Sequence, residues 1–262
     1  MKYNVVIANP ADNITIIVLD YVPREKYISI SNKILNNTTF RAEQVGFVKK
    51  PIMDGELRLE MMGGEFCGNA LRSFGMMVAR DKLIDKGNVI VEISGSNKSL
   101  VVEVDNINKT AKSEMPLPKE LEYVKINDYL ELPMVKFDGI YHIIAEDLYP
   151  TEHNFIYIRN NIIKNYNVDA LGVMFFNRDE YYITPVVYVR ATDTIFFESS
   201  CGSGTTATSF YLSHSYDNGI FKYSIKQPGG IIDSEVYKDN GIVTNLTIGG
   251  KVELSEVIEV EI

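Results

Sequence analysis

The stretch GGEFCGNALRSFG at residues 63–75 and the stretch ESSCGSGTTATSF at residues 198–210 share their central pattern. Each places one of the chain's two cysteines, Cys67 or Cys201, directly before a glycine and further small residues. After each cysteine, apolar residues return at the three-and-four spacing of an amphipathic helix. The two stretches therefore predict two helices that begin directly after the cysteines.

Both predicted helices have a candidate apolar face and a glycine-containing start. The face of the first helix consists of Ala70, Leu71, Phe74, Met77 and Val78. The face of the second consists of Ala207, Phe210, Tyr211 and His214. The tight turns at the two starts are eased by Gly68, Gly202 and Gly204. On this pattern His214 is expected to be a structural side chain on the apolar side of its helix.

The start of a helix has a chemistry of its own. Its backbone N–H groups lack helical partners and carry about half a positive charge. A cysteine there is expected to ionise more easily than the free residue, and an anion such as a carboxylate can bind there. If the two starts faced one bound amino acid, one thiolate could remove the α-proton while the other thiol protonated the opposite face. The pattern thus favours a two-thiol racemase.

The amino-acid composition is that of a globular protein with a sizeable core. Of the 262 residues, 45% are hydrophobic and 23% are charged, which is compatible with two lobes or with one large fold. The net charge of −9 argues against nucleic-acid binding, which needs clustered lysine and arginine to neutralise phosphates. No basic stripe is evident in the sequence. A nucleic-acid partner is therefore not expected.

Targeting and membrane signals are not evident in the sequence. The apolar run of MKYNVVIANPADNITIIVLD is interrupted by Asn9 and Pro10, unlike the core of a signal peptide. No later segment approaches the roughly 18 apolar residues that a membrane helix needs. We therefore expect a cytoplasmic protein with no membrane partner. In that reducing compartment Cys67 and Cys201 are expected as thiols rather than as a structural disulfide.

Short β-type runs dominate the chain on both sides of a proline-containing middle. They include YNVVIA, ITIIVLD, LRLEMM, VIVEIS and LVVEVD, and later IYHIIA, FIYIR, YYITPVVYV, TIFF and IVTNLTI. The segment SEMPLPKELEYVKINDYLELP at residues 113–133 has three prolines and no clear strand, so it is expected to connect two lobes. Residues 1–118 form the expected N-terminal lobe and 119–250 the C-terminal lobe. A last strand at about 250–262 could return to the first lobe, and each lobe is expected to have one marked helix.

Two cysteine elements in this order carry a resemblance to a known family. EFCGNA at residues 65–70 and SCGSGT at 200–205, followed by QPGG at 227–230, resemble the diaminopimelate epimerase superfamily of cofactor-independent amino-acid racemases and epimerases. The resemblance extends to Asn13 in ADNITIIV and to Gln44 in AEQVGFV. It implies an α/β (α+β) fold of two pseudo-symmetric lobes, each a sheet wrapped around a central helix.

The resemblance also implies roles for individual residues. Cys67 and Cys201 would be the acid–base pair, and the α-carboxylate would bind the backbone N–H groups of Gly68, Asn69, Gly202 and Ser203. Glu198 would accept from the substrate ammonium or side chain. Asn13 and Gln44 would contact the substrate, although each could equally be a turn or strand-end residue. The implied partner is a small amino acid, with no cofactor and no metal, and a homodimer stays open.

The segment before the second cysteine bears on the substrate. Diaminopimelate epimerases carry a Glu-Arg pair there, whereas no arginine follows Glu198 and the nearest, Arg190, lies well upstream. GxEFCGNA, ExSCGSGT and QPGG together are most similar to the histidine racemase branch, known from synthesis of staphylopine-type metallophores. The expected reaction is therefore L-histidine to D-histidine. Epimerisation of LL- to meso-diaminopimelate is the alternative.

Other classes of function fit the residues less well. His142, His153 and His214 are scattered, and neither CxxC nor HxxxH occurs, so a zinc site is not expected. No lysine lies in a context suited to a pyridoxal-phosphate Schiff base. Proline racemases follow their first cysteine with Gly-His, where this chain has Gly-Asn. A catalytically silent amino-acid-binding protein stays open, and ligand binding without α-proton exchange would identify it.

Overall fold

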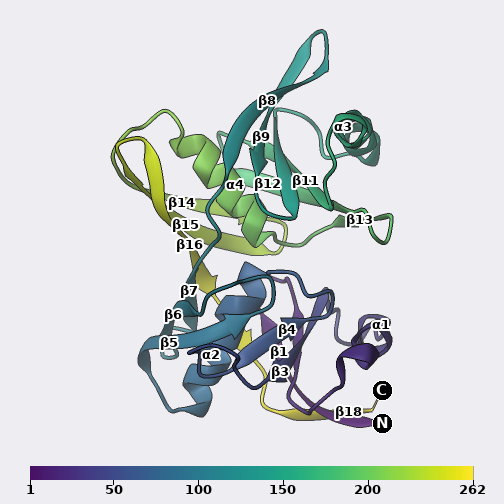
Figure 1. Ribbon diagram of the computed structural model, residues 1–262, viewed down its shortest axis with the longest axis vertical. Coiled ribbons are helices and arrows are strands. Elements are labelled where there is room, and N and C mark those ends of the chain that lie inside the picture. The colour runs from purple at the N-terminus through teal and green to yellow at the C-terminus, as the bar shows by residue number, and fades with distance from the viewer. Residues whose placement is uncertain (262) are drawn as a thin grey trace. The chain divides into compact units, whose positions relative to one another are not determined.

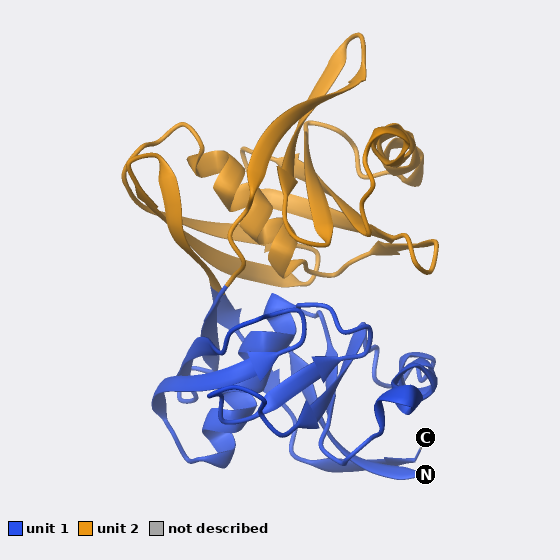
Figure 2. Cartoon of the chain, viewed as in Figure 1, with its two compact units in different colours: residues 1–114, 249–262 blue, residues 115–248 orange. Residues whose placement is uncertain are grey.

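The computed structural model describes residues 1–261, which form two compact units (Figure 2). The first unit is Met1–Glu114 together with the chain from Gly249 onward, and the second is Met115–Ile248. The return to the first unit occurs within strand β16 (Ile242–Lys251). Each unit combines strands with two α-helices, so the fold is mixed α and β (Figure 1).

A sheet of mostly short strands forms the first unit. Its strands are β1 (Lys2–Asn9), β2 (Thr15–Val18), β3 (Gln44–Lys49), β4 (Arg58–Met61), β5 (Lys86–Ile93), β6 (Leu100–Asp105), β7 (Thr110–Glu114), β17 (Glu253–Leu254) and β18 (Ile258–Glu261). β1 pairs antiparallel with β2, β17 and β18, β2 pairs parallel with β3, and β3 pairs antiparallel with β4. β4 then pairs parallel with β5, and β5, β6 and β7 continue antiparallel.

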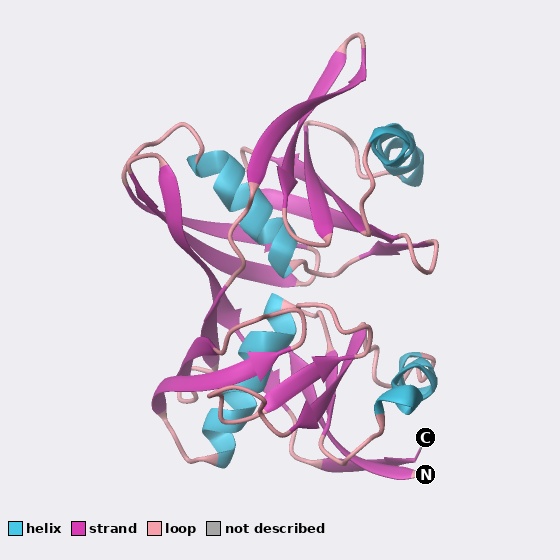
Figure 3. Ribbon diagram, in the orientation of Figure 1, coloured by secondary structure: helices cyan, strands magenta, loops and turns pink. Residues whose placement is uncertain are grey.

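Both faces of this sheet are covered by helices (Figure 3). All four residues of β2 are buried, as in a strand with apolar neighbours on both sides. Ile17 points into the cluster around helix α2 (Gly68–Asp81), and its neighbour Ile16 points into the cluster around α1 (Tyr27–Leu35). Alternation along the strands therefore builds two apolar layers at once.

Helix α2 is the central element of the first unit. Every residue from Gly68 to Ala79 is buried, and the helix packs against β5, β6 and β7. A Cβ on Gly75 would lie 2.5 Å from Cβ of Val102, so glycine allows β6 to approach the helix closely. The predicted helix after Cys67 is thus confirmed, including its apolar face.

The second unit repeats this combination of strands and helices. Its strands are β8 (Glu120–Asn127), β9 (Leu130–Lys136), β10 (Ile140–Glu146), β11 (Ala170–Asn177), β12 (Tyr182–Val189), β13 (Thr194–Phe197), β14 (Gly219–Gln227), β15 (Gly230–Asp239) and most of β16. β8, β9 and β10 pair antiparallel, and β10 pairs parallel with β11. β12 pairs antiparallel with β11 and β13 and parallel with β14, which pairs antiparallel with β15.

Two helices cover opposite faces of strands β9 to β12 in this unit. Ile143 belongs to the apolar cluster around α3 (Glu152–Asn165), and its neighbour Ile144 belongs to the cluster around α4 (Gly202–Ser213). Helix α4 also packs against β14 and β15. The predicted helix after Cys201 is confirmed, and it is again the helix enclosed by strands (Figure 1).

Three expectations about elements were wrong. Residues 113–133 contain β8 and most of β9 rather than a strandless connection, because Val124 and Ile126 face inward between charged or polar neighbours that obscure the pattern. FIYIR lies in α3, which Thr151 caps by accepting from the Asn154 N–H at 3.2 Å. Each unit therefore has a second α-helix, α1 or α3, beyond the one expected.

The apolar face expected for α4 was also wrong at its end. His214 is exposed and forms the C-cap after the last helical residue, so it is not a buried structural histidine. Hydroxyl side chains take the buried positions instead: Thr205, Thr206 and Thr208 donate to the carbonyls four residues earlier, at 2.8 to 2.9 Å. Within the described chain, no helix combines the length and the apolar character needed to cross a membrane.

Candidate active site

Both cysteines cap the start of their helices. Cys67 has φ −134° and ψ 114°, its Sγ accepts from the Ala70 N–H at 3.4 Å, and its carbonyl accepts from Leu71 N–H at 2.9 Å. In the ordinary N-cap a hydroxyl or carboxylate oxygen takes the place that this sulfur takes. Neither cysteine is in a disulfide, as expected for thiols.

The geometry around Cys201 repeats that of Cys67. Cys201 has φ −127° and ψ 111°, its Sγ accepts from the Gly204 N–H at 3.4 Å, and its carbonyl accepts from Thr205 N–H at 2.9 Å. Gly202 and Ser203 fill the first two helical positions, where backbone N–H groups find no partner within the helix. Each unit thus presents one sulfur beside the electropositive start of a helix.

The amides predicted to contact substrate form one hydrogen-bonded group in the first unit. Asn13 Oδ1 accepts from Gln44 Nε2 at 2.5 Å and from Asn69 Nδ2 at 3.1 Å. Asn13 itself is buried, in the turn between β1 and β2. The structure therefore brings Asn13 and Gln44 to Asn69, the second residue of α2, two positions after Cys67.

Two further residues belong to this hydrogen-bonded group, and neither was predicted from the sequence as a site residue. The Oε2 atom of Glu43 accepts from Asn13 Nδ2 at 2.5 Å, which adds a half-buried carboxylate. The fully buried Arg72 donates to Asn69 Oδ1 from Nε at 3.3 Å and from Nη2 at 3.1 Å, and to the Lys251 carbonyl from Nη1 at 3.3 Å. The available signal for Arg72 was that it is the one charged residue in GNALRSFG, the first eight residues of the helix.

The environment of Cys201 keeps its proton in place. Burial raises the pKa of the Cys201 thiol well above its usual range, and the nearby negative charge of Glu198 raises it further. Hydrogen bonds from Ser203 and from the Gly204 N–H oppose this effect without reversing it. The expectation that the helix start makes this cysteine easy to ionise is therefore wrong for Cys201, because desolvation and Glu198 outweigh the helix.

A buried histidine lies behind Cys201. His142 Nε2 is 3.0 Å from Ser203 Oγ, which in turn is 3.5 Å from Cys201 Sγ. Burial lowers the pKa of His142 to about 3, so the imidazole is neutral at neutral pH. Its Nδ1 atom has no hydrogen-bond partner among the described residues, and it faces Gly172 of the neighbouring strand. In the sequence His142 was only one of three scattered histidines, and no role was predicted for it. The signal that could have identified it is a lone histidine in the apolar run IYHIIA.

The upstream arginine is occupied elsewhere in the second unit. Arg190 is exposed and donates from Nη1 to Asn167 Oδ1 at 2.9 Å and from Nη2 to the Tyr166 carbonyl at 3.3 Å. These partners belong to the end of α3 and the loop that follows it. Arg190 is thus held on that loop rather than beside Glu198.

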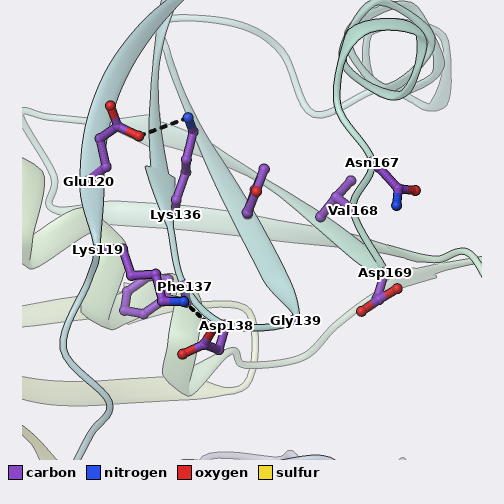
Figure 4. A pocket seen from close by; sticks show the side chains of 10 residues that line it. Lys119, Glu120, Lys136, Phe137, Asp138, Gly139, Asn167, Val168 and Asp169 are labelled. Carbon is purple, nitrogen blue, oxygen red and sulfur yellow. Dashed lines mark hydrogen bonds and ion pairs between the residues drawn. The ribbon is translucent and has the colours of Figure 1, made fainter.

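A separate cavity of about 340 Å³ lies on the second unit, away from the predicted residues (Figure 4). Four of its charged groups form two ion pairs, Lys119 with Asp138 and Lys136 with Glu120 at 2.9 Å, and Asp169 also lines it. Lys136 donates hydrogen bonds to the carboxylates of Glu122 and Glu120, and these bonds raise its pKa. Nowhere in residues 1–261 do three or more His, Cys, Asp or Glu side chains gather as a metal site would need.

Comparison with known proteins finds a matching family. The family described as Histidine racemase CntK N-terminal domain matches residues 2–257. A histidine racemase of Fusobacterium nucleatum subsp. nucleatum (strain ATCC 23726) is 36% identical over 256 residues, covering 94% of this chain and 92% of that protein. A histidine racemase of Staphylococcus aureus (strain Mu50) is 24% identical over 233 residues, covering 86% and 85%.

Solved structures share the fold with little sequence identity. A hydroxyproline epimerase from Agrobacterium vitis has a TM-score of 0.65 at 9% identity, covering 99% of this chain and 91% of that chain. A phenazine biosynthesis protein of the PhzF family from Enterococcus faecalis has a TM-score of 0.64 at 14% identity, with 100% of both chains covered. These likenesses show the architecture that this chain shares with an epimerase and a PhzF-family protein.

Proposed function

Because this chain belongs to the histidine racemase family and is an amino-acid racemase, we propose that it interconverts L- and D-histidine with Cys67 and Cys201 as its acid–base pair. The observation that carries this proposal is the shared capping geometry of the two cysteines, with each Sγ 3.4 Å from an N–H of the first helical turn. Two matched sulfurs are what inversion by two bases requires. On this proposal the two units are pseudo-symmetric halves of a diaminopimelate epimerase-like fold.

The proposed reaction breaks one C–H bond and forms another on the opposite face. The substrate carboxylate binds the helix-start N–H groups of Gly68 and Asn69 and of Gly202 and Ser203. One thiolate takes the α-proton, which leaves an electron pair on the α-carbon. The other thiol donates its proton to that carbon from the opposite side and becomes the thiolate. The reverse reaction exchanges the two roles, so no external acid or base is consumed.

Glu198 has two roles in this proposal. In the resting enzyme its charge, together with the burial of Cys201, holds the pKa of that thiol well above its usual range. A bound substrate with a cationic ammonium or imidazolium group would neutralise the charge of Glu198. Such pairing would lower the pKa of Cys201, because the carboxylate is one of the causes that raise it. Substrate binding would therefore make it easier for Cys201 to give up its proton during the reaction.

The substrate preference follows from the charges of the two half-sites. Asn13, Gln44 and Asn69 supply amides, and Glu43 and Glu198 supply carboxylates that suit a donor-bearing side chain. Arg190 is engaged with Asn167 and Tyr166. A second substrate carboxylate buried beside Glu198 would cost several kcal/mol unless it were paired or protonated. Histidine thus fits better than diaminopimelate, glutamate or aspartate.

The proposal is tested with a panel of L- and D-amino acids in deuterium oxide, with α-deuterium measured by NMR. We expect L- and D-histidine to exchange much faster than LL- or meso-diaminopimelate, and glutamate and aspartate to remain unlabelled. Efficient turnover of diaminopimelate without turnover of histidine would contradict the account of the pocket. Binding of histidine without α-proton exchange would identify a silent binding protein instead. Because the proposed mechanism requires both thiols reduced, we propose that the enzyme acts in a reducing compartment such as the cytoplasm.

A further inference from the structure

The backbone of Cys201 is held by a closed set of buried hydrogen bonds. The Cys201 N–H donates to Gln227 Oε1 at 2.7 Å. Gln227 Nε2 donates to Thr205 Oγ1 at 2.8 Å, and the Thr205 hydroxyl donates to the Cys201 carbonyl at 2.8 Å. Gln227 is 4% exposed and Thr205 is fully buried. One glutamine side chain thus connects both polar groups of the Cys201 backbone, one directly and one through Thr205.

These bonds constrain the direction of the Cys201 side chain. Cys201 lies before the helix in extended conformation, so its N–H has no part in the helical hydrogen bonds. With both its N–H and its carbonyl bonded, φ and ψ of this residue are fixed, and with them the Cα–Cβ direction. An adjacent bond holds the same loop: Gly229 N–H, two residues after Gln227, donates to the Ser199 carbonyl at 2.8 Å.

The first unit lacks the hydroxyl that completes this arrangement. The residue four positions after Cys67 is Leu71, whereas the residue four positions after Cys201 is Thr205. Leucine cannot donate to the carbonyl of its cysteine from a side chain, although its backbone N–H does so as in the second unit. The two capping cysteines therefore share their local conformation but not this support, and Cys67 serves as an internal control.

We propose that Gln227, acting through Thr205 as well as directly, is a positioning residue that sets the orientation of Cys201 Sγ. The side chain of Gln227 is bonded to the Cys201 N–H and to Thr205, so it acts on the backbone from which the sulfur projects. A base displaced by about 1 Å from its productive position can cost roughly 100-fold in rate. The proposal rests on the proposed role of Cys201 in racemisation, and it extends that role to the glutamine of the QPGG segment.

Four variants separate positioning from general stability. Gln227→Met keeps the approximate length of the side chain but removes its acceptor and donor. Thr205→Val removes the hydroxyl, and Thr205→Ser retains it. Thr208→Val is the matched control, because its buried hydroxyl donates to the Gly204 carbonyl at 2.9 Å in the same helix without contacting Cys201 or Gln227. Kinetics and the pH profile of alkylation of each cysteine, followed by mass spectrometry, are measured for all four.

We expect Gln227→Met and Thr205→Val to lower kcat by roughly 10- to 100-fold with KM changed by less than about threefold. Thr205→Ser should recover most of kcat, and Thr208→Val should retain it. The alkylation profile of Cys201 should change in the two impaired variants, while that of Cys67 should not. If Gln227→Met does not fold, the comparison of Thr205→Ser with Thr205→Val tests the proposal instead.

Several results would overturn the proposal. One is that Gln227→Met and Thr205→Val leave both kcat and the alkylation profile of Cys201 unchanged. Another is that Thr205→Ser loses as much kcat as Thr205→Val. A third is that the alkylation profiles of Cys67 and Cys201 change equally. A wild-type protein that lacks racemase activity would refute the proposed function alone. The alkylation profiles of Cys201 would still decide whether Gln227 positions that thiol.

Discussion

Acidification should destabilise the protein through His142. Desolvation lowers the pKa of His142 from its usual 6.5 to about 3 in the folded protein. Between these values the unfolded chain binds a proton that the folded chain does not, so stability falls as the pH drops below 6.5. At pH 5.0, 1.5 pH units below 6.5, this effect lowers the free energy of unfolding by about 2 kcal/mol. At pH 7.5 the effect of His142 on the free energy of unfolding is close to zero.

The assay is urea unfolding of the wild type and His142→Gln at pH 7.5 and pH 5.0. Glutamine does not titrate, and the other ionisable groups are common to both proteins. We therefore expect the wild type to lose about 2 kcal/mol more than the variant over this pH change. His153→Gln, at an exposed position, is the control and should behave as the wild type. Equal losses in wild type and His142→Gln, or an imidazolium NMR signal for His142 at pH 5.0, would refute the reasoning.

Two cysteine substitutions, one glycine substitution and removal of metal ions provide further tests. Cys67→Ser and Cys201→Ser should each lower kcat by roughly 100- to 10,000-fold without loss of folding, because a hydroxyl ionises far less readily than a thiol. Circular dichroism is the control for folding. Near-normal turnover in either variant would remove that cysteine from the mechanism. Gly172→Ala should destabilise the protein by about 1 to 3 kcal/mol in urea unfolding, because its Cβ would lie 2.2 Å from His142 Nδ1; unchanged stability would show that the imidazole moves aside freely. Racemisation should survive EDTA, and activity lost to chelation and restored by zinc would contradict the two-thiol mechanism.

The local features of the cysteine elements could be predicted from the sequence. Helix α2 was predictable because its apolar residues are large and regularly spaced, and the helix is buried from Gly68 to Ala79. The start of α4 was predictable by analogy with the first element. Its buried face was not, since Thr205, Thr206 and Thr208 are buried through hydroxyl bonds to the preceding turn. Apolar periodicity does not detect a helix buried in this way.

Contacts between distant residues account for most of what the sequence did not predict. His142 meets Ser203 across 61 positions, Glu43 meets Asn13 across 30, and Gln227 meets Cys201 across 26. The packing of strands, turns and helices from distant parts of the chain brings them together, and no local pattern encodes that packing. The pKa of Cys201 was misjudged for the same reason, because burial comes from the folded unit and not from the helix start alone.

The isotopic content of the first product tests the two-thiol mechanism most directly. Unlabelled L-histidine is converted in deuterium oxide, and the reaction is stopped while little D-histidine has formed. The α-position of each enantiomer is then analysed after chiral separation. If two different bases act on the α-carbon, as the proposal requires, the D-histidine should carry deuterium while the remaining L-histidine retains its α-proton. Early D-histidine that contains the substrate's own α-proton would show a single base acting on both faces and would contradict this account.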